Sequence, residues 1–281
     1  MTFLRKIFQN NINNLSSNLL LYILVLISLL PLLLVAINTF KSHADIIINP
    51  LTLPNELDFS NFSRAWKAGK FKIGIINSIL LSGTTIIVTL SFASLGAFVL
   101  ARRSIVGWQL ITIYFLCATT IPIQLFLFPL YFVFAKLGIV GNVIATAFIL
   151  SAINLPLATF LLRTYVLTIP SEIDDAAFLD GASPIQTFLH IIFPLLRPGL
   201  VTVGIIVGLN AWNEFLITST FQQGQSSFTM TLGYLSMNGT YATDQGAMMA
   251  GAFILVAPII VFFIVMQRFF ISGMAAGAVK G

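Results

Sequence analysis

Six long stretches of this sequence contain no Asp, Glu, Lys or Arg, and they limit what the chain can fold into. The stretches are residues 19–40, 73–101, 104–135, 137–162, 198–213 and 245–267, and the fifth continues past Glu214. About 20 mostly apolar residues cross the ~30 Å hydrocarbon core of a bilayer as a helix. Only 8% of the 281 residues are charged, whereas soluble domains carry about 25%. The pattern excludes a soluble globular domain and predicts an all-α integral membrane protein.

We expect six transmembrane helices in a single transmembrane domain over residues 1–281. The first uncharged stretch is too long for the core of a signal peptide. It is followed by Lys41-Ser-His-Ala rather than by a small-residue cleavage site, so we expect it to be retained. The predicted spans are about 19–40, 76–101, 107–134, 142–162, 199–220 and 246–268.

Basic residues near the spans predict the orientation. Arg5-Lys6 precede the first span, and Arg102-Arg103 occupy a very short turn. With both termini inside, eight basic residues face the cytoplasm and six face outward, four of the six in the long loop between residues 43 and 72. Because short loops close to spans carry most of the topological signal, we expect cytoplasmic N and C termini.

The cytoplasmic loop 163–198 breaks the pattern of short connections and predicts two short helices. Ser171 is a candidate N-cap, and Asp174, three residues later, would close a capping box. Gly181 would end this helix as a C-terminal cap. Ser183 and Pro184 then offer a second N-cap and first helical position.

The second predicted helix carries an apolar stripe at helical spacing, formed by Ile185, Phe188, Leu189 and Ile192. A helix pair of this size cannot bury the stripe alone, so it is typical of a docking element for a protein or for the bilayer surface. The plain alternative is an interfacial helix that only joins two spans. A lipid-binding helix should have a basic polar face, whereas this loop is acidic in its first half, which favours a protein partner.

The loop sequence Ile169-Pro-Ser-Glu-Ile-Asp-Asp-Ala-Ala-Phe-Leu-Asp-Gly-Ala-Ser, with Pro194 and Pro198 beyond it, resembles the EAA loop of permease subunits in bacterial ATP-binding-cassette (ABC) importers. Asp175 departs from that pattern, because the family usually has Glu there. Residues 121–131, 211–215 and 272–281 are similar to the carbohydrate branch of the family. The short chain ending in Gly-x-x-x-Gly-x-x-Lys-Gly resembles the second permease of maltose-type systems.

This resemblance implies a type I ABC importer permease fold whose cytoplasmic coupling helix sits in a groove of a separate ATPase. The coupling positions that match the motif are Asp175, Ala176, Ala177, Asp180 and Gly181. The resemblance also implies that a short, flexible C-terminal tail with Gly277 and Lys280 reaches the ATPase dimer. The alternative for this tail is an ordinary frayed terminus.

The fifth span contains the most polar patch of any span, formed by Asn210, Trp212, Asn213 and Glu214. Amides and a carboxylate beside an aromatic ring match the hydroxyls and the apolar face of a sugar, so the patch is a candidate substrate path. The alternative is hydrogen bonding to neighbouring helices, with Trp212 at the membrane interface.

Energy conversion is not expected in this chain, and neither is enzymatic activity. Lys70 follows Gly69, but the rest of a phosphate-binding loop is missing. We therefore expect no cofactor here, with ATP and Mg on the partner ATPase. His43 and His190 fall on opposite sides of the membrane and Cys117 is the single cysteine, so we expect no metal site.

The resemblance thus implies a permease subunit in a bacterial cytoplasmic membrane that imports a carbohydrate by alternating access. Its implied partners are a second homologous permease in a heterodimer, two ATPase subunits, an extracytoplasmic sugar-binding protein and membrane lipid, but no nucleic acid. Two alternatives remain open. The same fold could import polyamine, phosphate or molybdate, or the chain could be a membrane scaffold that recruits an ATPase without transport.

Overall fold

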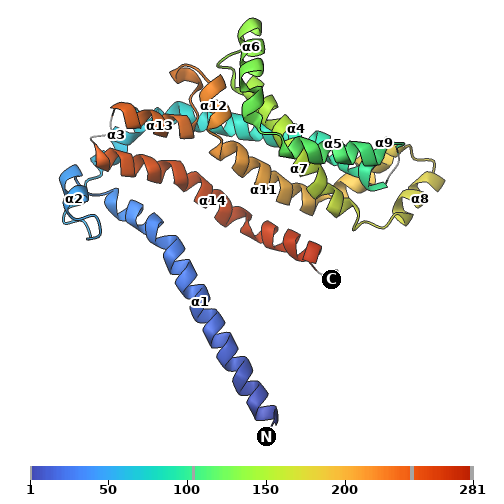
Figure 1. The fold of residues 1–281 in the computed structure, drawn as a ribbon, viewed down its shortest axis with the longest axis horizontal. Coiled ribbons are helices and arrows are strands. Elements are labelled where there is room, and N and C mark those ends of the chain that lie inside the picture. The colour runs from blue at the N-terminus through green and yellow to red at the C-terminus, as the bar shows by residue number, and fades with distance from the viewer. Residues whose placement is uncertain (1, 103–104, 241–243, 279–281) are drawn as a thin grey trace. The chain divides into compact units, whose positions relative to one another are not determined.

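The computed structural model describes residues 2–102, 105–240 and 244–278, and describes side chains for 18–102, 105–238 and 244–266. Helices are the only regular elements within these ranges (Figure 1). Contacts divide the chain into two units. The first unit holds residues 1–68 and 236–256, and the second holds 69–235 and 257–281.

The first unit contains α1 (Thr2–Asn38), α2 (His43–Ile48), α3 (Ser60–Ala68) and the beginning of α14 (Gln245–Ala278). Asn61 on α3 is fully buried, and its amide donates hydrogen bonds to the carbonyls of Thr39 at 2.8 Å and Lys41 at 3.0 Å. Arg64 on the same helix donates to a carboxylate oxygen of Asp244 at 2.9 Å. Polar contacts of α3 therefore hold together the chain that follows α1 and the chain that leads into α14.

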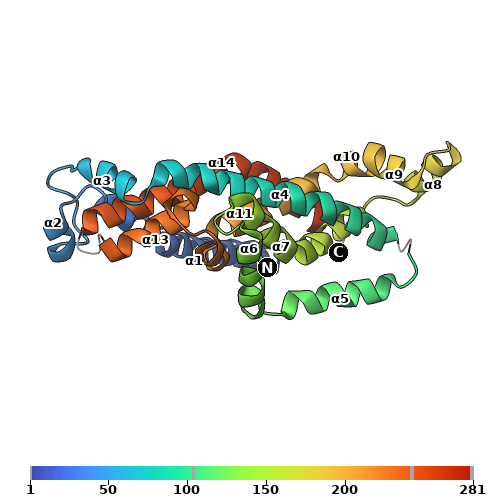
Figure 2. The same ribbon diagram turned by 90° about the horizontal axis from the view of Figure 1, so that it is seen from above.

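The core of the second unit is formed by α4 (Phe71–Arg102), α7 (Val143–Val166) and α11 (Arg197–Asn213), which lie side by side in Figures 1 and 2. Ala93, Ala97 and Ala101 line one face of α4 and are buried against Ala158 of α7 and Val203 of α11. Small side chains at four-residue spacing let membrane helices approach closely. The alanine stripe therefore explains how these three helices pack closely against one another.

The segment after α11 packs against the Phe71 end of α4. It contains α12 (Leu216–Phe221), η3 (Gln225–Ser227) and α13 (Met230–Thr240). Asn77 donates hydrogen bonds to the carbonyls of Ser226 and Phe228, each at 2.9 Å, and the Ser78 hydroxyl accepts one from the Met230 amide at 2.9 Å. This segment and loop 163–198 therefore lie at opposite ends of α4.

Four of the expected spans are single helices that are long and apolar enough to cross a membrane, in α1, α4, α7 and α14. The third expected span is bent by 88° between α5 (Trp108–Thr120) and the pair η1 (Ile123–Phe126) and α6 (Leu127–Leu137). The bend follows from Pro122, which has no amide hydrogen to continue a helix. Counting each bent pair as one span gives the expected six.

The fifth expected span, 199–220, is not one helix. A helical segment of α9 (Pro184–Thr187), η2 (Phe188–Ile192) and α10 (Phe193–Leu195) leads into α11 through a 75° bend, and α11 itself stops at Asn213. The Glu214 carboxylate accepts hydrogen bonds from the amides of Ile217 at 2.7 Å and Thr218 at 2.8 Å. It thereby caps the start of α12 and separates that helix from α11.

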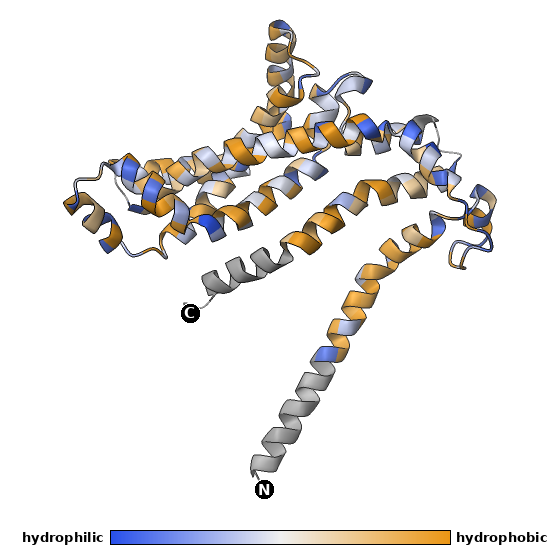
Figure 3. Cartoon of the chain, turned by 180° about the vertical axis from the view of Figure 1, so that it is seen from behind, coloured by the Kyte–Doolittle hydropathy of each residue, from blue (hydrophilic) through white to orange (hydrophobic). Residues whose placement is uncertain are grey.

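Large apolar side chains remain exposed along the membrane-spanning helices. Figure 3 shows hydrophobic residues along nearly all of the coloured part of α1, where side chains such as Leu26 and Tyr22 are well over half exposed. No side chain in the apolar window of α1 is buried within the described structure. Such a surface needs lipid or another protein subunit around it.

Candidate functional site

The loop between α7 and α11 is held against the end of α4 by an ion pair. Arg102, the last residue of α4, donates hydrogen bonds from its guanidinium to the carboxylate of Asp174 and to the carbonyl of Ile169, the latter at 3.1 Å. The side chains of Arg102 and Asp174 are only 14% and 16% exposed. Through these two contacts α4 fixes where α8 (Glu172–Leu179) begins.

The ion pair also corrects one expectation from the sequence. The predicted capping box of Ser171 and Asp174 does not form: Ser171 has helical backbone angles, and its side chain makes no capping hydrogen bond. The physical reason is that the Asp174 carboxylate is turned to Arg102 instead of back to the start of its own helix.

The predicted end of this helix is confirmed. Gly181 has φ +82°, the left-handed conformation that glycine adopts without strain. Its amide donates to the carbonyl of Phe178 at 3.0 Å, and the Ala182 amide donates to the carbonyl of Ala177 at 2.9 Å. These two bonds are the Schellman pattern of helix termination.

The second predicted helix start is also confirmed, but its apolar stripe is only half right. Ser183 and Gln186 form a reciprocal capping box, with Pro184 in the first turn. The chain then widens into a π-helical turn, Phe188–Ile192. Because this turn changes the helical register, Phe188 and Ile192 are buried, whereas Ile185 and Leu189 are about half exposed.

The structure brings the predicted coupling positions to one short helix and its cap. Asp175, Ala176 and Asp180 are exposed, whereas Ala177 is buried against its own chain. Figures 1 and 2 place α8 beyond one end of the α4, α7 and α11 bundle.

Two exposed side chains on α8 were missed by the sequence reasoning. Phe178 is 62% exposed and Leu179 is 90% exposed. The sequence signal was a pair of adjacent large apolar residues between Ala177 and the acidic Asp180. The short helix has no large apolar residue three or four positions away from either of them. We call Asp175, Ala176, Phe178, Leu179 and Asp180 the coupling surface. It combines carboxylates with a projecting apolar pair, a composition suited to a protein partner rather than to water.

The four residues of the predicted substrate path have different environments. Asn210 is exposed and donates to the side-chain oxygen of Asn154 on α7 at 3.1 Å, and Asn213 is also exposed. The Glu214 carboxylate is occupied by the amides of α12. The Trp212 indole lines an apolar cavity on another side of α11. The residues therefore do not converge on a single site.

Asn210 instead opens into a cavity of about 610 Å³ between α5, α7 and α11. Its lining includes Asn154, the Tyr114 side chain and the start of the bent segment near Ile121. Asn154 was not singled out from the sequence because it is one isolated amide in a long apolar run. The Asn154–Asn210 pair gives this cavity two side-chain amides that could bind hydroxyl groups.

The remaining predicted positions lie in the C-terminal segment. Gly277 lies within the bounds of α14, whereas the sequence predicts a flexible tail there. Lys280 lies outside the described residues. Within the side chains that the structure describes, no group of three His, Cys, Asp or Glu residues is arranged to hold a metal ion.

Comparison with known proteins supports the membrane architecture. Residues 93–275 match the model of the family described as binding-protein-dependent transport system inner membrane component. In solved structures, the chain is similar in fold to a bacterial ABC transporter involved in the import of the acidic polysaccharide alginate. The TM-score is 0.76 with 20% identity, over 93% of this chain and 98% of that chain.

Curated relatives extend the match over most of the sequence. The probable ABC transporter permease protein YurM of Bacillus subtilis is 31% identical over 89% of this chain and 83% of its own length. The arabinooligosaccharides transport system permease protein AraQ of Halalkalibacterium halodurans is 32% identical over 91% of this chain and 92% of its own. The chain therefore belongs to the binding-protein-dependent transport system inner membrane component family, whose members are multi-pass permeases of the type I ABC importer fold.

Proposed function

We propose that this chain is one of two membrane-spanning subunits of an ATP-driven importer that moves a sugar or short oligosaccharide into the cytoplasm. Support for the carbohydrate comes from relatives named for arabinooligosaccharides, for diacetylchitobiose and for melibiose, raffinose and stachyose. The observation that carries the proposal is the coupling surface, which a short capped helix holds at one end of the bundle.

In this proposal the coupling surface docks into a groove of a cytoplasmic ATPase, which holds ATP and Mg. The apolar pair Phe178 and Leu179 enters the groove, and Asp175 and Asp180 meet basic groups at its rim. Because α8 is tied to α4 through Arg102 and Asp174, movement of the ATPase is passed to the packed core of α4, α7 and α11. A second homologous permease, a second ATPase and an external sugar-binding protein complete the complex.

The sugar passes through the membrane between the two permeases. On this chain, the amides of Asn154 and Asn210 offer hydrogen bonds to sugar hydroxyls in the cavity between α5, α7 and α11. Both termini are cytoplasmic in this arrangement, and the tail with Gly277 and Lys280 lies near the ATPase.

The experiment is uptake by the source strain with the gene deleted, using labelled trehalose, melibiose, diacetylchitobiose and arabinotriose. We expect the initial uptake rate of at least one sugar to fall at least tenfold and to be restored by the wild-type gene. Leu179→Asp should not restore it, because it places a charge in the docked apolar pair. Val106→Asp is the matched control, since Val106 is fully exposed in the turn after α4 and outside the coupling surface.

Co-purification separates the alternatives. Tagged wild type and Val106→Asp should retain an ATPase and a second permease, whereas Leu179→Asp should lose the ATPase alone. Unchanged uptake of all four sugars with loss of polyamine, phosphate or molybdate uptake would contradict the carbohydrate assignment. A retained ATPase with no uptake defect for any solute would indicate a scaffold.

A further inference from the structure

The last turns of α4 contact loop 163–198 at two places. The Arg102 guanidinium donates to the Asp174 carboxylate at the start of α8. Phe98, on the same helix, packs against Phe188 in the helical segment α9–η2–α10, with ring centroids 5.5 Å apart. Phe98 and Arg102 are four positions apart, so they lie on the same face of α4. One face of α4 therefore holds both α8 and the segment that leads into α11.

The Phe188 side chain is enclosed on the side of the bundle. The residue is buried, and the Phe193 ring packs on it with centroids 5.8 Å apart. Ile192 and Leu196 follow Phe188 at four-residue spacing and are also buried. Leu196 belongs to the core cluster of α4, α7 and α11, and Phe98 packs against the same cluster. A continuous buried row therefore connects Phe188 with the core.

The π-helical turn Phe188–Ile192 supports this row. Its defining bond runs from the Phe193 amide to the Phe188 carbonyl, five residues earlier. In a regular α-helix of 3.6 residues per turn, rows at four-residue spacing drift around the axis. The wider π turn brings Phe188 and Ile192 to the same side. Such turns within helices occur frequently at functional sites.

The corner between α8 and α9 is also well defined. Only residues 180–183 separate the two helices. On one side the Ala182 amide donates to the Ala177 carbonyl at 2.9 Å, and on the other Ser183 and Gln186 form the reciprocal capping box. A loop held to α4 at one point would pivot about that point. A loop with a bonded corner that is held at two points moves together with α4.

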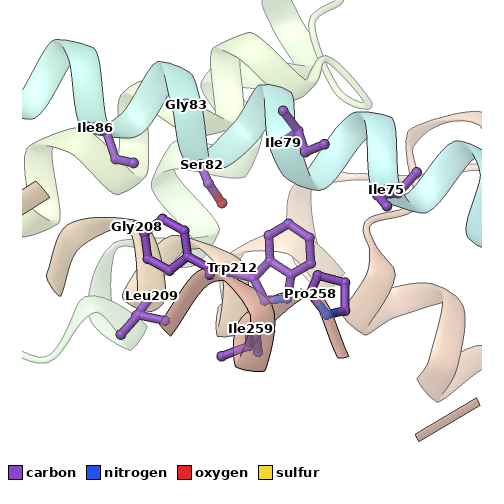
Figure 4. Close-up of a pocket in the computed structure, with 11 residues that line it drawn as sticks. Ile75, Ile79, Ser82, Gly83, Ile86, Gly208, Leu209, Trp212, Pro258 and Ile259 are labelled. Carbon is purple, nitrogen blue, oxygen red and sulfur yellow. The ribbon is translucent and has the colours of Figure 1, made fainter. Parts of the chain in front are cut away.

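The Phe98 contact reaches α4 where the bundle is closely packed. Ala97 and Ala101, on either side of Phe98 in the sequence, are buried against α7 and α11. Further along α4, between Ile75 and Ile86, an apolar cavity of about 350 Å³ lies between α4, α11 and the second-unit part of α14 (Figure 4). Close-packed interiors transmit strain. Both contacts with the loop therefore act on the end of α4 that can pass movement to its neighbours.

We propose that Phe188 is a positioning residue for transport, and that its contact with Phe98 is the second of two anchors through which loop 163–198 moves as one body with α4. The first anchor, Arg102 with Asp174, moves with the start of α8. The second moves with the segment that leads into α11. Without it the ATPase stays bound and active, but pivoting of the loop absorbs its movement. This inference rests on the proposed transport function.

The test uses the intact complex in liposomes that enclose ATP, with the sugar-binding protein outside. The probe is whichever of trehalose, melibiose, diacetylchitobiose and arabinotriose the deletion strain fails to take up, and sugar uptake and ATP hydrolysis are measured in the same sample. Phe188→Ala should retain the ATPase in co-purification, because the coupling surface is unchanged. It should lower the number of sugar molecules moved per ATP hydrolysed at least tenfold.

Leu195→Ala is the matched control. Leu195 lies on α10 in the same helical segment, is about half exposed and takes no part in the aromatic contacts. This variant should keep the wild-type ratio of sugar to ATP. Phe188→Leu tests whether an apolar side chain without a ring suffices, and it should keep part of the ratio that Phe188→Ala loses.

A double variant separates an anchor from a general role in folding. Phe98→Ala should lower the ratio as Phe188→Ala does, and the two together should lower it no further than either alone, because both remove the same contact. A purely structural role would instead reduce uptake and hydrolysis in proportion and leave the ratio unchanged.

Three results would overturn the anchor. They are an unchanged ratio in Phe188→Ala, loss of the ATPase from the purified Phe188→Ala complex, and additive effects of the two alanine substitutions. A wild-type complex that moves no sugar would overturn the proposed transport function and the anchor with it. Normal wild-type uptake with an unaffected Phe188→Ala variant would overturn the anchor alone.

Discussion

At the scale of single residues, the contact between Arg102 and Asp174 connects the packed core to the coupling surface. Its geometry is incomplete, since one guanidinium nitrogen and one carboxylate oxygen are buried without a partner in the described structure. A buried pair of this kind is weak evidence for net stabilisation, but removing one partner leaves an uncompensated charge. The pair therefore acts as a positional constraint on α8 more than as a source of stability.

A double-mutant cycle tests this constraint. Asp174→Ala alone should lower the stability of the loop by about 2–3 kcal/mol, somewhat below the value for a fully buried pair, because the Arg102 charge stays partly buried. Arg102→Ala alone should have a similar effect. The double variant should lose less than the sum of the two, measured as protease resistance of loop 163–198 in the purified complex.

The matched control for this cycle is Glu172→Ala, which removes an exposed acidic side chain from the same helix turn. It should change the stability of the loop, measured from its protease resistance, by less than about 0.5 kcal/mol. Strict additivity of the Arg102 and Asp174 variants would contradict a direct coupling between the two side chains.

At the scale of helices, the N-termini of α8 and α9 in loop 163–198 differ in which groups accept hydrogen bonds from their first backbone amides. Ser183 bonds the Gln186 amide, and the Gln186 side chain returns a bond to Ser183. Ser171 makes no comparable side-chain bond. The same residue type therefore has two different energetic roles in one loop, and this gives a paired prediction.

Ser183→Ala should destabilise the start of α9 by about 1 kcal/mol, because it removes a side-chain cap. Ser171→Ala should be close to neutral. Hydrogen exchange of the loop amides in the complex measures both effects. The Gln186 amide should exchange about five times faster in Ser183→Ala and at the wild-type rate in Ser171→Ala. Equal effects of the two substitutions would show that the Ser183 cap has no special role.

The helices also show which features the sequence could predict. Four of the apolar runs, the Gly181 terminus and the Ser183 cap are local signals, and these are confirmed. The contact of Arg102 with Asp174 joins residues 72 positions apart, and no local pattern announces it. The same holds for the break after α11. The sequence presents Glu214 as a polar group in a span, whereas the amides of α12 that it caps become visible only in three dimensions.

For the same reason, the sequence predicts some residues of the candidate site and not others. Asp175, Ala176 and Asp180 came from a sequence motif and are exposed on α8. The apolar stripe of the second helix was only half right, because a π-helical turn at Phe188–Ile192 shifts the register. Regular periodicity cannot anticipate such a turn, since the turn adds one residue to a pattern that assumes 3.6 residues per turn.

At the scale of the whole molecule, α4 fixes which loops share a side of the membrane. It is one continuous helix of 32 residues, about 48 Å long. Val106 follows its Arg102 end. Gln225 lies at its Phe71 end, in the η3 segment beside the bonds of Asn77. These two positions must therefore lie on opposite sides of the membrane, and labelling can decide which side is cytoplasmic.

Cys117 is the single cysteine of this chain, so Cys117→Ser gives a version of it without thiols. In this background, Gln225→Cys should react with a membrane-impermeant maleimide added to intact cells. Val106→Cys should react only after the membrane is opened, because the Arg102 end and the coupling surface must face a cytoplasmic ATPase. The reverse pattern would place the coupling surface outside the cell, where ATP is not supplied. It would thereby contradict both the predicted orientation and the proposed ATPase contact, whereas the fold and the family would stand.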